Sequence, residues 1–267
     1  AHQSDDTYAN GNNDINSWLK TFARLGDFAD KIDAGVAQIV NAAGKYVIPG
    51  MIDIHSHAGG IANYTRIRNG GGFSPIAEPM RRGGMRVICF AAVADTPTHR
   101  LMEGRIRPYR TPGPGELYLW GQTALGRIVE LAKSEGLRIV AKAADLDLPG
   151  PAVVISSEGA DFLEGQIDRV DEAYNRWTLR HLQLTHYRVN ELGDIQTEPP
   201  EHNGLTDFGA DVVRRCNKLG IVVDVAHGTL DLVRRAVRTT TKPLVLSHTS
   251  LLDRFRQFTR RISVEHA

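Results

Sequence analysis

The chain has 267 residues, of which 42% are hydrophobic and 24% are charged, and its formal net charge is +1. This composition is that of a folded globular domain and excludes an intrinsically disordered chain. The chain has 32 basic and 31 acidic residues, a balance that argues against nucleic acid as a partner. It contains no run of about 18 apolar residues, so no membrane span is predicted.

The N-terminal part of the chain carries little functional information. Residues 1–46 are predicted as a lead-in with one amphipathic stretch, INSWLKTFARL, and residues 47–267 as a barrel domain. The first residue is Ala1, so removal of an upstream leader stays open, and with it a cytoplasmic or a periplasmic or secreted location. The two cysteines, Cys89 and Cys216, are too few for a disulfide scaffold and are expected in the core.

From residue 47 onward, short apolar runs alternate with stretches of helical periodicity. The runs are continuous and bounded by Gly or Pro, which is typical of buried parallel strands. Strands are predicted at 47–54, 86–93, 152–156, 182–185, 221–226 and 243–247, with an additional one at 137–144. Helices are predicted at 74–84, 117–136, 161–180, 206–220 and 229–240, and a surface or lid loop at 95–115. Repeated βα units predict an α/β fold with a parallel sheet covered by helices.

A histidine or a glutamate follows five of these runs. The strand-end residues are His55 and His57, Glu158, His186, His227 and His248. In a (β/α)8 barrel the carboxyl ends of the strands meet at one mouth, so these side chains are expected to form one cluster. Imidazoles with a carboxylate are a ligand set for Zn²⁺ and similar metals, and several of them around one mouth can hold two ions.

Each of these residues also has a structural interpretation. A single histidine after a strand can be a hydrogen-bonded structural residue, and Glu158 could be stabilised at the N-terminus of the helix that follows it. His186 fits either a metal ligand or a donor that faces the substrate. The recurrence of one residue type at one position favours the metal site. The other histidines are assigned to the surface or to structural positions: His2, His99, His181, His202 and His266.

Several motifs resemble a known family of enzymes. PGMIDIHSH resembles the opening strand of the amidohydrolase superfamily. The later segments VVISSEG, LTHYRVNELGD, GLTDFGADVVRRCNKLGIVVDVAH and PLVLSHTS are similar to the membrane (renal) dipeptidase family of zinc peptidases. The resemblance covers roughly residues 45 to 263. It implies a TIM-like (β/α)8 metal-dependent hydrolase barrel with two divalent ions, most commonly Zn²⁺, and a small dipeptide or amide substrate. Members of the family are often homodimers.

The resemblance also implies a role for each strand-end residue. His55 and His57 would bind the first metal, Glu158 would bridge both ions, and His227 and His248 would bind the second. His186 falls where the family uses a histidine to contact the substrate and the developing oxyanion. Arg260 or Arg261, in the pair that follows SHTS, would hold the free carboxylate of a dipeptide, a role that suits a guanidinium.

The sequence departs from the family pattern at two points. The first strand carries His-x-His, the pattern of the wider amidohydrolases, where the dipeptidases carry His-x-Asp. The chain also ends at ISVEHA, before the strand that supplies the family's proton-handling aspartate. We therefore expect either a piece of a longer enzyme, with a barrel incomplete at its C-terminus, or an incomplete relative.

The function expected from these features is metal-dependent hydrolysis of the amide bond of dipeptides by a hydroxide bound between two metals. A different amidohydrolase that acts on a cyclic amide, a lactone or an ester is the first alternative, because of the His-x-His strand. The second is a metal-binding relative without turnover.

Overall fold

The computed structural model describes residues 51–57, 75–251 and 259–266, all of which belong to one compact unit, Gly50–Ala267. The predicted lead-in at 1–46 and the start of the first predicted strand, 47–50, lie outside the described residues, so the domain boundary stays a prediction. Within the described part, no helix is long and apolar enough to cross a membrane.

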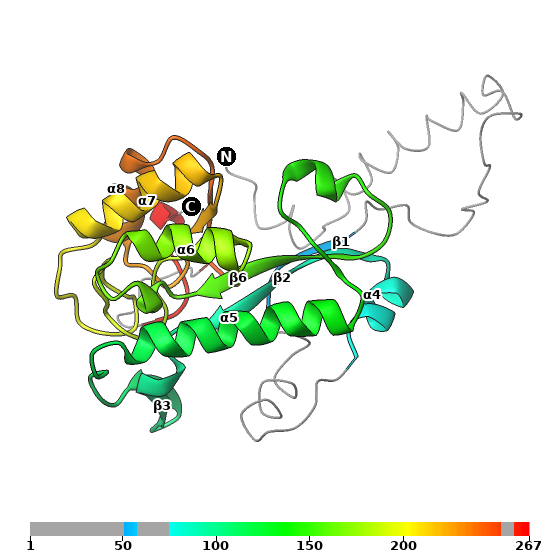
Figure 1. The fold of residues 1–267 in the computed structure, drawn as a ribbon. Helices are drawn as coiled ribbons and strands as arrows, with labels where there is room; N and C mark the ends of the chain where they lie inside the picture. The colour runs from blue at the N-terminus through cyan, green and yellow to red at the C-terminus, as the bar shows by residue number, and fades with distance from the viewer. Residues whose placement is uncertain (1–50, 58–74, 252–258, 267) are drawn as a thin grey trace, which may run out of the picture. The chain divides into compact units, whose positions relative to one another are not determined.

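Seven parallel strands form the main sheet, in the order β1-β2-β6-β7-β8-β9, with β5 paired beside β6 (Figure 1). The order is open, because β1 and β9 stand at its two ends. The predicted α/β fold is thus confirmed as a curled, incomplete TIM-like barrel. The strands are β1 (Met51–Ser56), β2 (Met85–Val93), β5 (Arg138–Ile139), β6 (Ala152–Glu158), β7 (Leu179–Gln183), β8 (Val222–Asp224) and β9 (Leu244–Val245).

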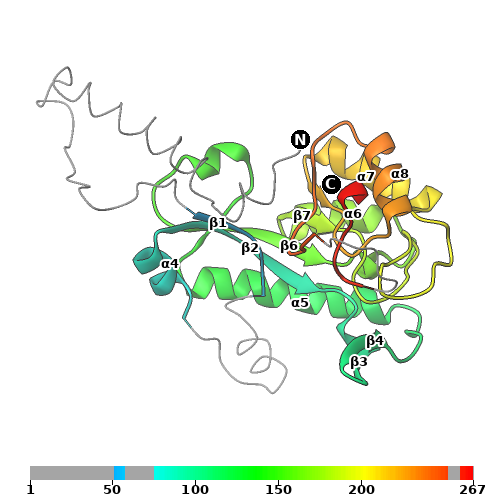
Figure 2. The same cartoon turned by 180° about the vertical axis from the view of Figure 1, so that it is seen from behind.

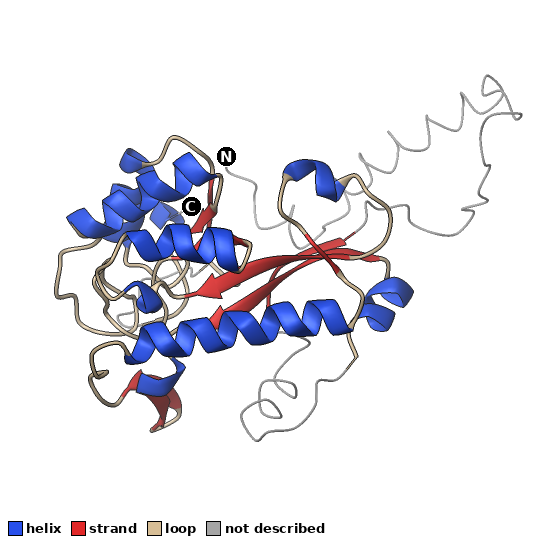
Figure 3. Cartoon of the chain, viewed as in Figure 1, coloured by secondary structure: helices blue, strands red, loops and turns tan. Residues whose placement is uncertain are grey.

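Amphipathic helices cover the sheet, and Figure 3 shows the long helix α5 lying along β2 and β6. The core forms where helix residues such as Leu125 and Val213 pack with strand residues such as Phe90 and Ile155. Threonine side chains cap α7 and α8 at their N-termini. The helices are α4 (Ala77–Gly83), α5 (Glu116–Ser134), α6 (Asp168–Arg176), α7 (Asp207–Leu219) and α8 (Leu230–Thr239).

The predicted loop at 95–115 contains regular structure, so this prediction is wrong in part. After a short 3₁₀ turn, β3 (His99–Met102) and β4 (Arg105–Pro108) form an antiparallel hairpin beyond the carboxyl end of β2 (Figure 2). Glu103 and Gly104 connect the two strands, with φ of 50° and 79°. Positive φ at both central residues is the geometry that closes a two-residue hairpin, and it is compatible with Glu-Gly.

Several other predicted elements are shorter than expected, among them the strands predicted at 221–226 and 243–247, which are reduced to β8 and β9. The extra strand expected at 137–144 is reduced to the two residues of β5, and a 3₁₀ turn follows at Ala143–Leu146. The helix expected at 161–180 is interrupted, because Glu164 and Gly165 have left-handed backbones with φ of 43° and 75°. A left-handed residue ends a right-handed helix, so α6 begins only at Asp168.

Gly209 lies in α7 where the helix approaches a neighbouring loop closely. A Cβ on this residue would collide with the carbonyl oxygen of Leu192 and would lie 2.6 Å from Leu205 Cδ1. We expect Gly209→Ala to lower the free energy of unfolding by about 1–3 kcal/mol, because overpacking outweighs the better helix propensity of alanine. Gly83→Ala in α4 is the matched control, since its Cβ would meet nothing within 4 Å. Equal denaturant midpoints for the two variants would contradict this expectation.

Candidate active site

The carboxyl ends of five strands bring the residues predicted from the sequence to one edge of the sheet. His55 lies in β1, His57 follows its last residue, and Glu158 is the last residue of β6. The other histidines each stand three residues beyond the end of a strand: His186 after β7, His227 after β8 and His248 after β9. Because the strands are parallel, the same displacement along the chain places these side chains together.

Glu158 is the centre of this cluster. Its Oε2 lies 3.3 Å from Nε2 of His57. Its Oε1 lies close to Nε2 of four imidazoles: His55 at 3.4 Å, His186 at 3.3 Å, His227 at 3.4 Å and His248 at 3.2 Å. Two atoms bound to one zinc ion at about 2.0–2.1 Å in tetrahedral geometry lie roughly 3.3 Å apart, so this spacing fits ligands that share ions.

The Glu158 carboxylate is buried and incompletely paired. Its residue is 2% exposed, and Oε2 has no hydrogen-bond partner among the described residues. Burial raises the pKa of this carboxyl, but the charge of His186 and the contact with His227 outweigh burial and hold the pKa well below its usual range. A buried carboxylate that stays ionised requires compensating positive charge, and divalent ions would supply it.

Burial favours the neutral form of three histidines around Glu158, which is the form that binds a metal. It lowers the pKa of His57 and of His248, and it lowers the pKa of His227 to about 3, although Glu158 opposes the shift each time. A histidine binds a metal through the lone pair of its neutral form. Atoms suited to holding one ion lie within 4.8 Å of one another in overlapping sets, among them His55, His57 and Glu158, and Glu158, His186 and His227. The residues present therefore fit divalent metals.

Asp224 fixes the two histidines that follow β8 and β9. Its Oδ1 accepts hydrogen bonds from the backbone N–H groups of Ala226, at 2.9 Å, and Ser247, at 3.2 Å, and each donor directly precedes one of these histidines. His227 and His248 have left-handed backbones, with φ of 69° and 36°. Such a conformation is strained in a residue other than glycine and occurs most often at functional sites. The carboxylate thus helps to hold a strained pair of histidines in place.

Asp95 is a site residue that sequence analysis missed. It is fully buried, and its Oδ1 lies 2.7 Å from Nδ1 of His186 and 3.1 Å from Nδ1 of His99. Burial lowers the pKa of His186, but Asp95 and Glu158 outweigh burial and raise it to about 9. The raised pKa favours the cationic form of His186, whereas burial lowers the pKa of His57, His227 and His248. His99, assigned to the surface or to a structural position, contacts Asp95 beside His186, a contact compatible with a structural role.

The structure separates the two candidate arginines. Arg260 lies at the site, where its Nη2 is 2.8 Å from Nε2 of His248, and its buried Nη1 has no hydrogen-bond partner among the described residues. Arg261 is exposed, and its backbone carbonyl accepts a hydrogen bond from Gln196. Of the pair, Arg260 alone has a guanidinium in contact with a strand-end histidine.

Comparisons with known proteins identify the family of this chain. The family model described as "Membrane dipeptidase (Peptidase family M19)" matches residues 78–261. Dipeptidase aclJ of Aspergillus oryzae is 35% identical over 29% of this chain and 18% of its own length, and dipeptidase tcpJ of Claviceps purpurea is 32% identical over 37% and 23%. Human dipeptidase 3 is 28% identical over 37% of this chain and 21% of its own length. The matched segments thus span less than a quarter of these curated relatives.

Solved structures share the fold at low sequence identity. The crystal structure of the dipeptidase AC, a metallopeptidase of family M19, aligns with a TM-score of 0.60 and 19% identity over 75% of this chain and 63% of its own. A metallopeptidase from Rhodobacter sphaeroides, liganded with a phosphinate mimic of the dipeptide L-Ala-D-Ala, gives 0.60 and 19% over 75% and 65%. Since the family model spans most of the described residues, including four of the strand-end residues, the chain belongs to the membrane dipeptidase family, peptidase family M19.

Proposed function

We propose that this chain hydrolyses the amide bond of dipeptides with the help of two bound divalent ions, and that its histidine-rich ligand set selects Zn²⁺. The observation that carries the proposal is the convergence of Nε2 atoms from five imidazoles on the two oxygens of Glu158, at 3.2–3.4 Å. Membership of the dipeptidase family supports the same reaction class.

The ligand roles are assigned from the strand that carries each histidine, because β1 stands at one end of the sheet and β8 and β9 at the other. His55 and His57 would hold one ion, His227 and His248 the other, and Glu158 would serve both. Divalent ions, when bound in such a site, polarise a carbonyl and lower the pKa of water to about 7, which supplies a nucleophile at neutral pH. The contact between Arg260 and Nε2 of His248 must open for that nitrogen to serve as a ligand, because one lone pair cannot do both.

The remaining site residues would act on the substrate directly. His186, cationic because of Asp95, would donate a hydrogen bond from Nε2 to the oxyanion that develops on the scissile carbonyl. Arg260 would bind the free carboxylate of the dipeptide through its guanidinium, whose Nη1 lacks a partner within the described structure. His186 is oriented by Asp95 before the substrate arrives, so its hydrogen bond would need little reorganisation.

One observation favours a second candidate function. His57 offers an imidazole at the position where the His-x-Asp pattern of the dipeptidase family has a carboxylate, so the site holds one negative charge fewer. This ligand pattern is the commoner one in amidohydrolases that act on a cyclic amide, a lactone or an ester. Assays of such substrates beside dipeptides distinguish the two candidates.

The test is elemental analysis combined with a dipeptidase assay, on this chain and on the longest natural polypeptide that contains it. We expect two zinc ions per chain, one of them lost in His55→Ala and the other in His227→Ala, with hydrolysis lost in both variants. His202→Ala, which removes an exposed imidazole away from the site, is the control. Metal without turnover in the longest polypeptide would favour a metal-binding relative, and two metals with full activity in either site variant would overturn the ligand assignment.

A further inference from the structure

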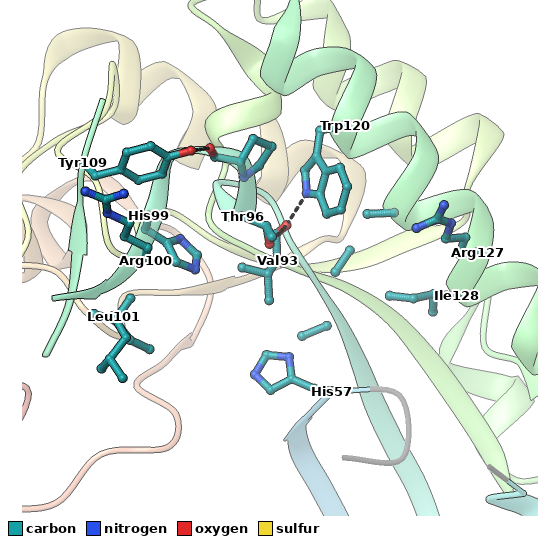
Figure 4. Close-up of a pocket in the computed structure, with 15 residues that line it drawn as sticks. His57, Val93, Thr96, His99, Arg100, Leu101, Tyr109, Trp120, Arg127 and Ile128 are labelled. Carbon is teal, nitrogen blue, oxygen red and sulfur yellow. Dashed lines mark hydrogen bonds between the residues drawn. The ribbon is translucent and has the colours of Figure 1, made fainter. Parts of the chain in front are cut away.

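A cavity of about 890 Å³ opens beside His57, and its described lining does not include Arg260 (Figure 4). Within the described residues, β1 pairs with β2 as far as Ser56 and Phe90, whereas β2 pairs with β6 as far as Val93. The last residues of β2, from Ala91 to Val93, therefore extend past the described end of β1 and line the cavity. A cavity of this size lies within the range of about 300–1,000 Å³ that is typical of sites for drug-sized ligands.

The walls of the cavity are largely apolar. Leu101 and Ile106 of the β3–β4 hairpin line one side, and Trp120 and Ile128 of α5 line the other. Trp120 is held in place, because its indole N–H donates to the carbonyl oxygen of Val93 at 2.8 Å. Leu101 is 72% exposed, so its side chain is accessible to a ligand in the cavity. These residues would bury an apolar group.

The charged residues of the cavity have one sign. Arg100 and Arg127 line it, and no aspartate or glutamate does so among the described residues. Arg100 stacks over the Tyr109 ring, with its guanidinium carbon 4.6 Å from the ring centroid. A lysine or arginine side chain would find no carboxylate in this described lining and would be repelled by the guanidinium groups. The cavity thus disfavours a cationic group.

The position of the cavity indicates which part of a substrate it would meet. His57 contacts Oε2 of Glu158, whereas His248, the partner of Arg260, contacts Oε1. A dipeptide with its carboxylate on Arg260 would have its scissile bond near Glu158, so its amino-terminal residue would lie toward His57. The side chain of that residue is the group nearest to the cavity.

We propose that the cavity formed by β2, the β3–β4 hairpin and α5 binds the side chain of the substrate's amino-terminal residue and selects a large apolar group, such as an aromatic ring, over a methyl group and over a cationic side chain. The inference rests on the proposed dipeptidase function and specifies its substrate class. Burial of an aromatic ring in such a cavity corresponds to a preference of roughly 10- to 200-fold over a methyl group.

The first experiment compares three dipeptides that share their second residue and carry alanine, phenylalanine or lysine first. With the zinc-loaded full chain, we expect kcat/KM to be roughly 10- to 200-fold higher for phenylalanine than for alanine, and lowest for lysine. Binding of two phosphinate dipeptide mimics, with a methyl or a benzyl group at the first position, is measured by calorimetry. This gives the same comparison without turnover, and the benzyl mimic should bind more tightly by a similar factor.

Three variants locate the preference in the cavity. Ala124→Phe fills the cavity from α5, and Leu101→Ala removes an exposed part of its wall; both should reduce the ratio between the benzyl and methyl probes toward one. Thr123→Phe adds the same ring to an exposed neighbouring position on α5 outside the cavity lining and should keep the wild-type ratio. Circular dichroism checks that each variant is folded.

The outcomes separate the two proposals. If the wild-type chain hydrolyses none of the dipeptides and binds neither mimic, the proposed function fails and the substrate assignment fails with it. If hydrolysis and binding occur but show no preference for the aromatic group, the cavity assignment alone is wrong. It is also wrong if folded Ala124→Phe and Leu101→Ala both keep the wild-type ratio.

Discussion

Glu158→Gln is expected to reduce hydrolysis to less than about one hundredth of the wild-type kcat/KM, because loss of even an outer partner of a metal ligand typically costs 10- to 100-fold. The amide keeps the shape of the side chain but removes the negative charge that faces all five imidazoles. Both ions should therefore bind more weakly, in contrast to the histidine variants, which should each lose one. Metal content by elemental analysis and kcat/KM at saturating zinc measure the two effects.

The control for this variant is Glu130→Gln, which makes the same chemical change at an exposed position on α5. It should keep both ions and the wild-type rate. A folded Glu158→Gln protein with two metal ions and full activity would show that Glu158 is not a shared ligand. The structural interpretation of this residue, as a carboxylate that only stabilises the start of the following segment, would then be preferred.

Asp224→Ala is expected to lower the free energy of unfolding of the metal-free chain by about 3–5 kcal/mol, the usual result of breaking a buried charged contact. Asp224 is fully buried, its Oδ1 accepts two backbone hydrogen bonds, and its Oδ2 lies 3.4 Å from Nε2 of His181. Removing the carboxylate leaves these donors without a partner inside the barrel. Affinity for the ion held by His227 and His248 should fall as well, because the backbone before both residues is released.

Denaturant unfolding followed by circular dichroism measures the stability, and a zinc titration measures the affinity. Asp211→Ala is the matched control: its carboxylate is 64% exposed and pairs only with Arg214 on the same helix turn, so its loss should cost less than about 1 kcal/mol. Asp224→Asn keeps an acceptor oxygen and should fall between the two. Similar midpoints for Asp224→Ala and Asp211→Ala would contradict the role given to Asp224.

The sequence allowed the elements of the sheet and most of the helices to be predicted, because these depend on local patterns. The helix at 206–220 has a threonine cap at one end and Gly220 at the other, and α7 occupies that range. The strand-end histidines could be grouped because parallel strands turn a repeated sequence position into a shared location in space. Both the secondary-structure elements and the grouping of the histidines could therefore be inferred from patterns that repeat along the sequence.

The parts that could not be predicted depend on the conformation of loops. Arg260 and Arg261 are adjacent and chemically identical, so the sequence offered no pattern to decide which guanidinium points into the site. Asp95 did have a usable signal, because it stands two residues beyond the end of β2, but it was included in the loop predicted at 95–115. The cavity beside His57 depends on the hairpin turn at Glu103 and Gly104, and so it emerged only from the three-dimensional structure.

The left-handed backbones at His227 and His248 imply a trade-off between thermal stability and the proposed activity. A residue with a side chain in this conformation costs on the order of 1–3 kcal/mol, whereas glycine adopts it freely. Selection for thermal stability alone would therefore favour glycine at both positions. Such substitutions would remove the proposed metal ligands His227 and His248. Any engineered form that is both robust and active must gain its stability elsewhere in the barrel.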